Sequence, residues 1–229
     1  FVKRWKFDET KVGSATHPLA ADWTAANRFY WNMCELDNLK LQNVLLPDRY
    51  TEETGIYFVT PYDPDKIPIV FVHGLVSSPD AFKNIVNELV PEPWFRKNYQ
   101  IWLYNYPTGN PWIYSSMKFR EKMRDATAYA RTKGPDAKLN RMVIVAHSMG
   151  GLVSRSSVTD PGTVIYDGMF KKPIDQVKVS EANRRLIREG LLYQPLGEPK
   201  RVVFMAVPHR GSPMASMQLS MWISKLIRL

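Results

Sequence analysis

The stretch MVIVAHSMGG, residues 142–151, decides how this chain of 229 residues is interpreted. An apolar run of strand length, residues 142–145, breaks into small-His-Ser-x-Gly and is followed by a segment of helical character. This order is the sequence form of a nucleophile elbow, in which the positions two before and two after the serine must be small. Ala146 and Gly150 occupy those two positions. We therefore predict that Ser148 is a nucleophile with its Oγ exposed at the carboxyl end of a strand.

The helix predicted after Ser148 favours chemistry at this position. Free N–H groups at a helix amino terminus, together with the helix dipole, stabilise negative charge that develops beside them. A serine before two glycines can also mark a plain loop. Here the strand before it and the apolar Leu152 and Val153 after it favour the elbow. The chain is therefore predicted to be a serine hydrolase.

A second motif lies far upstream, where the apolar run IPIVFV at residues 67–72 ends in HGLVSS. Near-continuous apolar runs of this length are typical of strands covered on both faces. In acyl-transfer enzymes with an elbow, the loop after such a strand supplies one N–H of the oxyanion hole, and the residue after the nucleophile supplies the other. The predicted donors are the amides of Leu75 and Met149. Gly74 lets the backbone approach the reacting carbonyl without a Cβ in between.

Three motifs together resemble the α/β-hydrolase family, and within it the bacterial lipases and lipid esterases. They are VHGL at residues 72–75, AHSMGGLV at 146–153 and VPHRGS at 207–212. The resemblance covers about residues 56–229, with the elbow as its most specific part. It implies an α/β fold with a doubly wound, mostly parallel sheet, and a catalytic triad in the order serine, acid, histidine.

The order of the apolar runs supports this fold, because predicted strands alternate with helical patterns. Strands are predicted at residues 55–59, 67–72, 99–104, 142–145 and 201–207. No strand is recognisable after the last of these, so the C-terminal strands of the sheet and its lid are expected to be truncated.

Besides the helix after Ser148, two further helices are predicted between these strands. One begins after Ser78, which can cap it with Pro79 at the first helical position, and ends before Pro91. The other has apolar residues at helical spacing, namely Phe119, Met123, Ala126 and Ala130. Residues 159–199 are polar and interrupted, and we expect them to run over the catalytic edge of the sheet.

The chain is divided into three regions. Residues 1–55 are expected to be an extension whose aromatic side chains pack on the core, with a lipid-facing surface as the alternative. Residues 56–212 are expected to hold the α/β-hydrolase core. Residues 213–229 are expected to begin a lid helix with Trp222 and Ile223 on its apolar face, with a buried structural helix as the alternative.

None of the four histidines is assigned as the base of the triad. His147 is expected to pack inside the elbow, His73 to order the oxyanion loop, and His17 to be exposed in a loop. His209 follows a predicted strand at the active edge, where a site-lining role is favoured over that of base. The residues expected to line the site are His73, Gly74, His147, Gly150 and His209.

No carboxylate is assigned to the triad either. Asp160, Asp167 and Asp175 follow the nucleophile, but none follows a convincing strand, and Asp160 is typical of a turn. The triad acid and histidine are therefore expected after Leu229, so that this chain alone would show at most residual turnover. An internal triad built from His209 and one of the three aspartates is the alternative.

The composition is that of an ordinary globular domain, with 45% hydrophobic and 23% charged residues. The formal net charge is +9, but lysine and arginine are scattered among acidic residues. We therefore expect a solvated basic surface and no nucleic-acid partner. The single cysteine, Cys34, excludes an internal disulfide and any cysteine metal site, and is expected to be a small buried hydrophobe.

The predicted activity is serine-dependent hydrolysis of carboxylic esters through an acyl-enzyme, with lipid-like esters favoured. Acyl transfer or amide hydrolysis on the same fold, and a non-catalytic module used for binding, are the alternatives. No metal ion or organic cofactor is implied, and the expected partner is a small-molecule or lipid ester, presented in solution or at a lipid interface. No stretch reaches the length of a membrane helix and no signal peptide is visible. The bacterial cell envelope or secretion is favoured over the cytoplasm, and the sequence does not define the oligomeric state.

Overall fold

The computed structural model describes residues 9–18, 53–211, 213 and 217. Near the amino terminus, β1 (Glu9–Val12) and β2 (Ala15–Pro18) pair as an antiparallel hairpin. His17 lies in β2 opposite Thr10 and is exposed, so the prediction of exposure is confirmed but the prediction of a loop is wrong. The hairpin was not predicted, because its two strands are only four residues long and show no clear alternation of apolar and polar residues.

The main sheet has five strands in the order β3-β5-β4-β6-β7. Its strands are β3 (Gly55–Phe58), β4 (Ile67–Val72), β5 (Tyr99–Asn105), β6 (Met142–His147) and β7 (Pro199–Met205). The first of these runs antiparallel to β5, and all other pairings are parallel. Ala146 of β6 stands opposite Val72 on one side and Phe204 on the other, so the carboxyl ends of β4, β6 and β7 meet at one edge.

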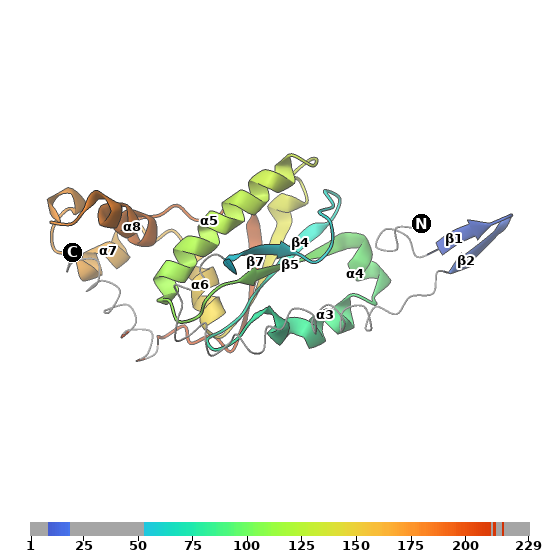
Figure 1. Ribbon diagram of the computed structural model, residues 1–229, viewed down its shortest axis with the longest axis horizontal. Coiled ribbons are helices and arrows are strands. Elements are labelled where there is room, and N and C mark those ends of the chain that lie inside the picture. Colours follow the sequence, from blue (N-terminus) through green and yellow to red (C-terminus); the bar gives the residue numbers. More distant parts are fainter. Residues whose placement is uncertain (1–8, 19–52, 212, 214–216, 218–229) are drawn as a thin grey trace.

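The helices fill the connections between these strands. They are η2 (Pro79–Phe82), α3 (Lys83–Leu89), α4 (Pro93–Asn98), α5 (Trp112–Arg131), η3 (Leu139–Arg141), α6 (Met149–Val158), α7 (Val164–Met169), η4 (Ile174–Gln176) and α8 (Glu181–Leu191). In Figure 1, α5 and α3 lie on opposite sides of the strands. This arrangement confirms the predicted α/β fold with a doubly wound, mostly parallel sheet.

Both faces of the sheet are buried because its strands alternate apolar side chains between two cores. Val70 and Val72 of β4 pack in one core with residues of α5 and α6, such as Phe119 and Val153. Phe71, between them in the chain, points to the other core, which η2, α3 and α4 close. A strand covered on both faces must be apolar at every position, which explains the continuous run that predicted it.

Several boundaries differ from the sequence prediction, and those of β3 and β5 differ by a single residue. The segment after Ser78 is a 3-10 turn followed by α3, and the Ser78 hydroxyl donates to the carboxylate of Asp80 instead of capping a helix. The predicted strand at residues 142–145 continues through His147. The last strand begins at Pro199 and ends at Met205. By contrast, the four apolar positions predicted for α5 are all buried.

Residues 159–199 were predicted as an irregular excursion, but they contain α7, η4 and α8. These elements have a small core of their own with the start of α5, formed by Ile113, Tyr166, Phe170, Ile187 and Leu191. The Ser180 side chain caps α8 by accepting from the N–H of Asn183 at 3.2 Å. The helix α8 is strongly amphipathic, with Ile187 and Leu191 buried and Leu186 packed beside them, so its helical periodicity was present in the sequence and was overlooked among the many charged residues.

One buried cation joins this excursion to the main domain. Arg120 of α5 is only 1% exposed, and its guanidinium donates to the carbonyls of Ser156 at 3.5 Å and Glu189 at 2.5 Å. Both carbonyls lie near helix carboxyl termini, where the helix dipole favours a cation. The guanidinium also lies 3.5 Å from the centre of the Tyr193 ring. Burial lowers the pKa of Arg120 to about 10, and these contacts offset the cost of burying its charge.

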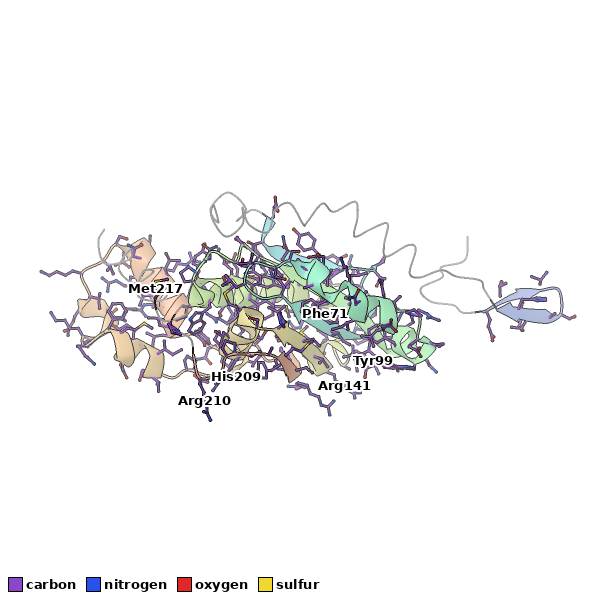
Figure 2. The ribbon with its side chains drawn as sticks, turned by 90° about the horizontal axis from the view of Figure 1, so that it is seen from below. Phe71, Tyr99, Arg141, His209, Arg210 and Met217 are labelled. Atoms are coloured by element: carbon purple, nitrogen blue, oxygen red, sulfur yellow. The ribbon has the colours of Figure 1, made fainter. Side chains whose placement is uncertain are left out.

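The direction of the strands is visible in Figure 2. Tyr99 and Arg141, at the amino ends of β5 and β6, lie towards one end of the molecule, and His209, after β7, lies towards the other. The helices α7 and α8 lie to the left of the main sheet in Figure 1. Most of the predicted N-terminal extension, residues 1–55, falls outside the described residues, which include only the hairpin and residues 53–55 of it; Cys34 is among the residues left out. Trp222 and Ile223 of the predicted lid also fall outside the described residues.

Candidate active site

A tight strand–turn–helix is centred on Ser148. The backbone of this residue has φ 52° and ψ −124°, and α6 begins at the next residue, Met149. Positive φ at a non-glycine residue is strained, by about 1–3 kcal/mol, and persists only where the surroundings impose it. Here the N–H of Ser148 donates to the carbonyl of Met205 at 2.9 Å, so the neighbouring strand β7 holds the turn. The half-buried Ser148 therefore stands at the shared carboxyl edge of β4, β6 and β7.

Two glycines after the serine allow α6 to start against the sheet. A Cβ at Gly150 would lie 2.3 Å from the carbonyl oxygen of Val72 and 2.4 Å from that of His73. A Cβ at Gly151 would lie 2.1 Å from Cγ2 of Val207. No side chain fits at these distances, because two of the three neighbours are rigid backbone atoms. Both glycines are needed for Ser148 to reach this edge.

The loop HGLVSS, residues 73–78, which we call the HGL loop, lies directly beside Ser148. A Cβ at Gly74 would stand 2.9 Å from the Cβ of Ser148 and 3.2 Å from Nδ1 of His147. The motif far upstream in the sequence is thus in contact with the serine. Among the backbone hydrogen bonds of the described residues outside regular helices and strands, none is donated by the N–H of Leu75 or Met149.

Side chains from the loop after β5 hold the HGL loop in place, and sequence reasoning missed them. The Tyr106 hydroxyl donates to the carbonyl of His73 at 2.7 Å, and the two rings stack at 4.4 Å. The N–H of Val76 donates to Oγ1 of Thr108 at 3.1 Å. Burial raises the pKa of Tyr106 far above its usual value, so this hydroxyl remains a donor. The available signal was that strands β4 and β5 are parallel neighbours, which places their following loops together.

Two of the predicted site histidines lie inside this arrangement. His73 is fully buried, and its Nδ1 lies 3.1 Å from the carbonyl of Gly74. Its position beside Tyr106 is that of a residue ordering the HGL loop. His147 is the last residue of β6 and is half-buried, with its ring against Gly74.

The third site histidine, His209, has its described contacts with Arg155 and Phe204, and none with the serine hydroxyl. Its Nδ1 is 3.5 Å from a guanidinium nitrogen of Arg155, and its ring packs edge-on against Phe204 at 4.6 Å. A base must come within hydrogen-bond distance of the hydroxyl it deprotonates. This position does not give His209 that contact.

The candidate carboxylates are also engaged elsewhere. Asp160 accepts from the N–H of Gly162 at 2.8 Å, which makes it the turn residue that was predicted. Asp175 pairs with Arg188 at 2.7 Å. Asp167 is exposed on α7. The described contacts of His209 are with Arg155 and Phe204, not with a carboxylate.

Other kinds of site were sought in the same residues. Within the described ranges, no group of three or more histidine, cysteine, aspartate or glutamate side chains could hold a metal ion. Nor does any described helix combine the length and apolar character needed to cross a membrane.

Comparison with known proteins gives likeness at the level of the fold. No protein-family model matches the sequence, and no curated protein matches it. Among solved structures, the mature lipase BlEst2 of Bacillus licheniformis is 21% identical with a TM-score of 0.42, covering 75% of this chain and 56% of its own. Esterase B from Lactobacillus rhamnosis, inhibited by a tributyrin phosphonate, is 13% identical with a TM-score of 0.43, covering 90% and 66%.

A third solved structure is esterase 2 of Thermogutta terrifontis, phosphonylated by sarin. It is 15% identical with a TM-score of 0.36, and the match covers 72% of this chain and 73% of the esterase. The chain spans less than two thirds of the length of the first lipase and esterase named above. Identities and scores this low carry no chemistry, which therefore rests on the geometry around Ser148. What the strand order and flanking helices show is an α/β fold with a doubly wound, mostly parallel sheet.

Proposed function

We propose that this protein is a serine-dependent carboxylic ester hydrolase with Ser148 as its nucleophile. One observation carries the proposal. The strained turn of Ser148, at the amino terminus of α6, lies against the backbone of Gly74 in the HGL loop. A nucleophile elbow beside a glycine-containing loop is the arrangement that acyl-transfer chemistry requires on this fold.

In the proposed reaction, Oγ of Ser148 attacks the ester carbonyl and its proton leaves to a base. The amides of Leu75 and Met149 form the oxyanion hole and donate to the carbonyl oxygen while it carries negative charge. Removing one such donor costs about 3 kcal/mol in comparable enzymes. The alcohol departs with a proton, which leaves an acyl-enzyme, and a water molecule then releases the acid and regenerates the serine.

The base is proposed to come from outside the described residues. All four histidines of the chain are accounted for, and none bonds to Oγ of Ser148 within the described part. Lipid-like esters remain the preferred substrates on the resemblance stated above.

The test is ester hydrolysis by the full-length protein. Ser148→Ala should lower kcat on a p-nitrophenyl ester by about 10⁴-fold or more, because a triad loses its nucleophile. Ser14→Ala, in the exposed turn between β1 and β2, is the matched control and should keep normal turnover. Near-normal hydrolysis by Ser148→Ala would contradict the proposal. Hydrolysis of amides but not esters by the unmodified protein would instead favour the amidase alternative.

A further inference from the structure

Val76, which follows the proposed oxyanion donor Leu75 in the HGL loop, has a strained backbone. Its φ is 52°, in the left-handed region that favours glycine. A β-branched residue adopts this region rarely, and only where the surroundings impose it. Val76 is 50% exposed, so burial of its side chain contributes little to holding this conformation. The contacts of its backbone are therefore the place to look for the cause.

One such contact comes from the loop after β5. The N–H of Val76 donates to Oγ1 of Thr108 at 3.1 Å, across 32 residues of sequence. Thr108 is fully buried, so its hydroxyl is held in a single place by the packing around it. Removing a buried acceptor leaves its donor without a partner, which is costly. The bond thus ties the strained residue to a rigid neighbouring loop.

The peptide units on both sides of the Leu75 N–H are held by side chains. In the unit before it, the carbonyl of His73 accepts from the Tyr106 hydroxyl at 2.7 Å. In the unit after it, the N–H of Val76 donates to the threonine. In the unit itself, the carbonyl of Gly74 lies 3.1 Å from Nδ1 of His73, which must carry a proton because a carbonyl only accepts. A trans peptide directs its N–H opposite to its carbonyl, so these three contacts fix the direction of the Leu75 N–H.

We propose that Thr108 is a positioning residue of the oxyanion hole. By accepting from Val76, its hydroxyl holds the left-handed turn that aims the amide of Leu75 at the carbonyl oxygen of the ester. The inference rests on the proposed function of Ser148 and gives a role to a residue outside the three sequence motifs. Donors that are held in place before the reaction stabilise an oxyanion without reorganising, so their direction affects the rate.

The first test is hydrolysis of p-nitrophenyl acetate by the full-length protein. Thr108→Val removes the hydroxyl at nearly constant volume and should lower kcat about tenfold with KM little changed, because the donor is misdirected rather than lost. Thr108→Ser keeps the hydroxyl and should restore most of kcat. The matched control is Thr127→Val, at a position of α5 that is 1% exposed and whose hydroxyl donates to the carbonyl of Arg124. This control should keep normal kcat.

A second comparison shows whether the hydroxyl acts through the strained turn. Glycine adopts positive φ without steric cost, so in a Val76→Gly background the turn depends less on the hydroxyl. Thr108→Val should then lower kcat by about threefold or less, a coupling that a double-mutant cycle measures. Equal factors in the two backgrounds would show that Thr108 does not act through the backbone of Val76, and would overturn the inference.

A further pair of variants covers the case in which Thr108→Val does not fold. Thr108→Cys and Thr108→Ser differ only in the acceptor atom, and sulfur is a weak acceptor. The cysteine variant should have a kcat about tenfold below that of the serine variant, and equal kcat in the two would overturn the inference.

Failure of this inference is distinguishable from failure of the proposed function. Loss of turnover in Ser148→Ala together with unchanged kcat in a folded Thr108→Val overturns the inference alone. Near-normal turnover in Ser148→Ala overturns the proposed function, and the inference with it. Loss of turnover in Ser148→Ala, a lower kcat in Thr108→Val and recovery in Thr108→Ser support both.

Discussion

Gly74 and Ser148, separated by more than seventy residues in the sequence, are in contact. The backbone of Gly74 packs so closely on the side chain of Ser148 that the glycine Cα can carry a hydrogen on that side but not a methyl group. A Cβ at Gly74 would lie 2.9 Å from the Cβ of the serine. The contact sets the distance between the HGL loop and the proposed nucleophile, Ser148. Any group that separates the two also moves the amide of Leu75.

Gly74→Ala should therefore impair catalysis more than folding. The added methyl group pushes the HGL loop away from Ser148, so the Leu75 amide no longer reaches the oxyanion. We expect kcat to fall about 10²–10³-fold with KM little changed. Steady-state kinetics and a thermal melt check this together. Unaltered kcat in a folded protein would show that the loop does not supply an oxyanion donor.

Gly150→Ala and Gly168→Ala should have opposite effects on stability. A methyl group at Gly150 meets two backbone carbonyl oxygens, at 2.3 and 2.4 Å, and should lower the free energy of unfolding by about 1–3 kcal/mol or more. Gly168, within α7, has nothing within 4 Å of its Cβ position. Alanine there should raise the free energy of unfolding by about 0.5–1 kcal/mol, since glycine is a poor helix former. Urea denaturation of both variants tests the packing of the turn.

Arg120→Ala should detach the excursion formed by α7 and α8 from the main domain. The variant loses charged hydrogen bonds to Ser156 and Glu189 and the cation–π contact with Tyr193, worth about 2–4 kcal/mol together. Arg120→Lys keeps the charge but not the two-pronged donor geometry and should recover only part of this loss. Arg185→Ala removes an exposed ion pair with Glu189 and serves as the control, with little effect expected. Equal stability of Arg120→Ala and the control would show that the buried cation does not join the two parts.

Stability should fall in alkali because Tyr104 is fully buried. Burial raises the pKa of its hydroxyl well above 10.0, whereas the unfolded chain ionises near that value. The folded state thus keeps a proton that the unfolded state loses. The free energy of unfolding should therefore decrease above about pH 10, by up to about 1.4 kcal/mol per pH unit for each such tyrosine.

Tyr104→Phe removes this proton and should make the alkaline decrease shallower. Tyr129→Phe, at an exposed position of α5, is the matched control. Urea unfolding between about pH 9 and about pH 11 gives the slope for each variant. Identical slopes for Tyr104→Phe and the unmodified protein would contradict the argument.

The parts of the fold that could be predicted from the sequence are those in which the local pattern of apolar residues matches the faces that are buried in the structure. Strand β4 is apolar at every position because both of its faces are covered, and α5 has its apolar residues on the one face that packs on the sheet. The turn at Ser148 was recognisable because only small residues fit two positions before and after it. The HGL loop was recognisable because a glycine follows a buried strand.

Other features arise from contacts across the sheet, which no local pattern encodes. Tyr106 and Thr108 hold the HGL loop from a neighbouring strand end, and their positions in the sequence indicated only a turn. His209 was placed at the correct edge of the sheet, but its contact with Arg155 depends on the direction in which α6 leaves Ser148. The apolar face of α8 was present in the sequence and was overlooked, whereas its attachment through Arg120 is a tertiary contact that no local pattern encodes.

The measurement that tests the central claim most directly is covalent labelling of the full-length protein with a fluorophosphonate, followed by peptide mapping. An activated serine at an elbow reacts with such a probe, whereas the other serines of the chain do not. We predict a single adduct on the peptide that contains Ser148, and no adduct on that peptide in Ser148→Ala. An adduct on a different serine, or full activity in a protein whose Ser148 is quantitatively modified, would contradict the account.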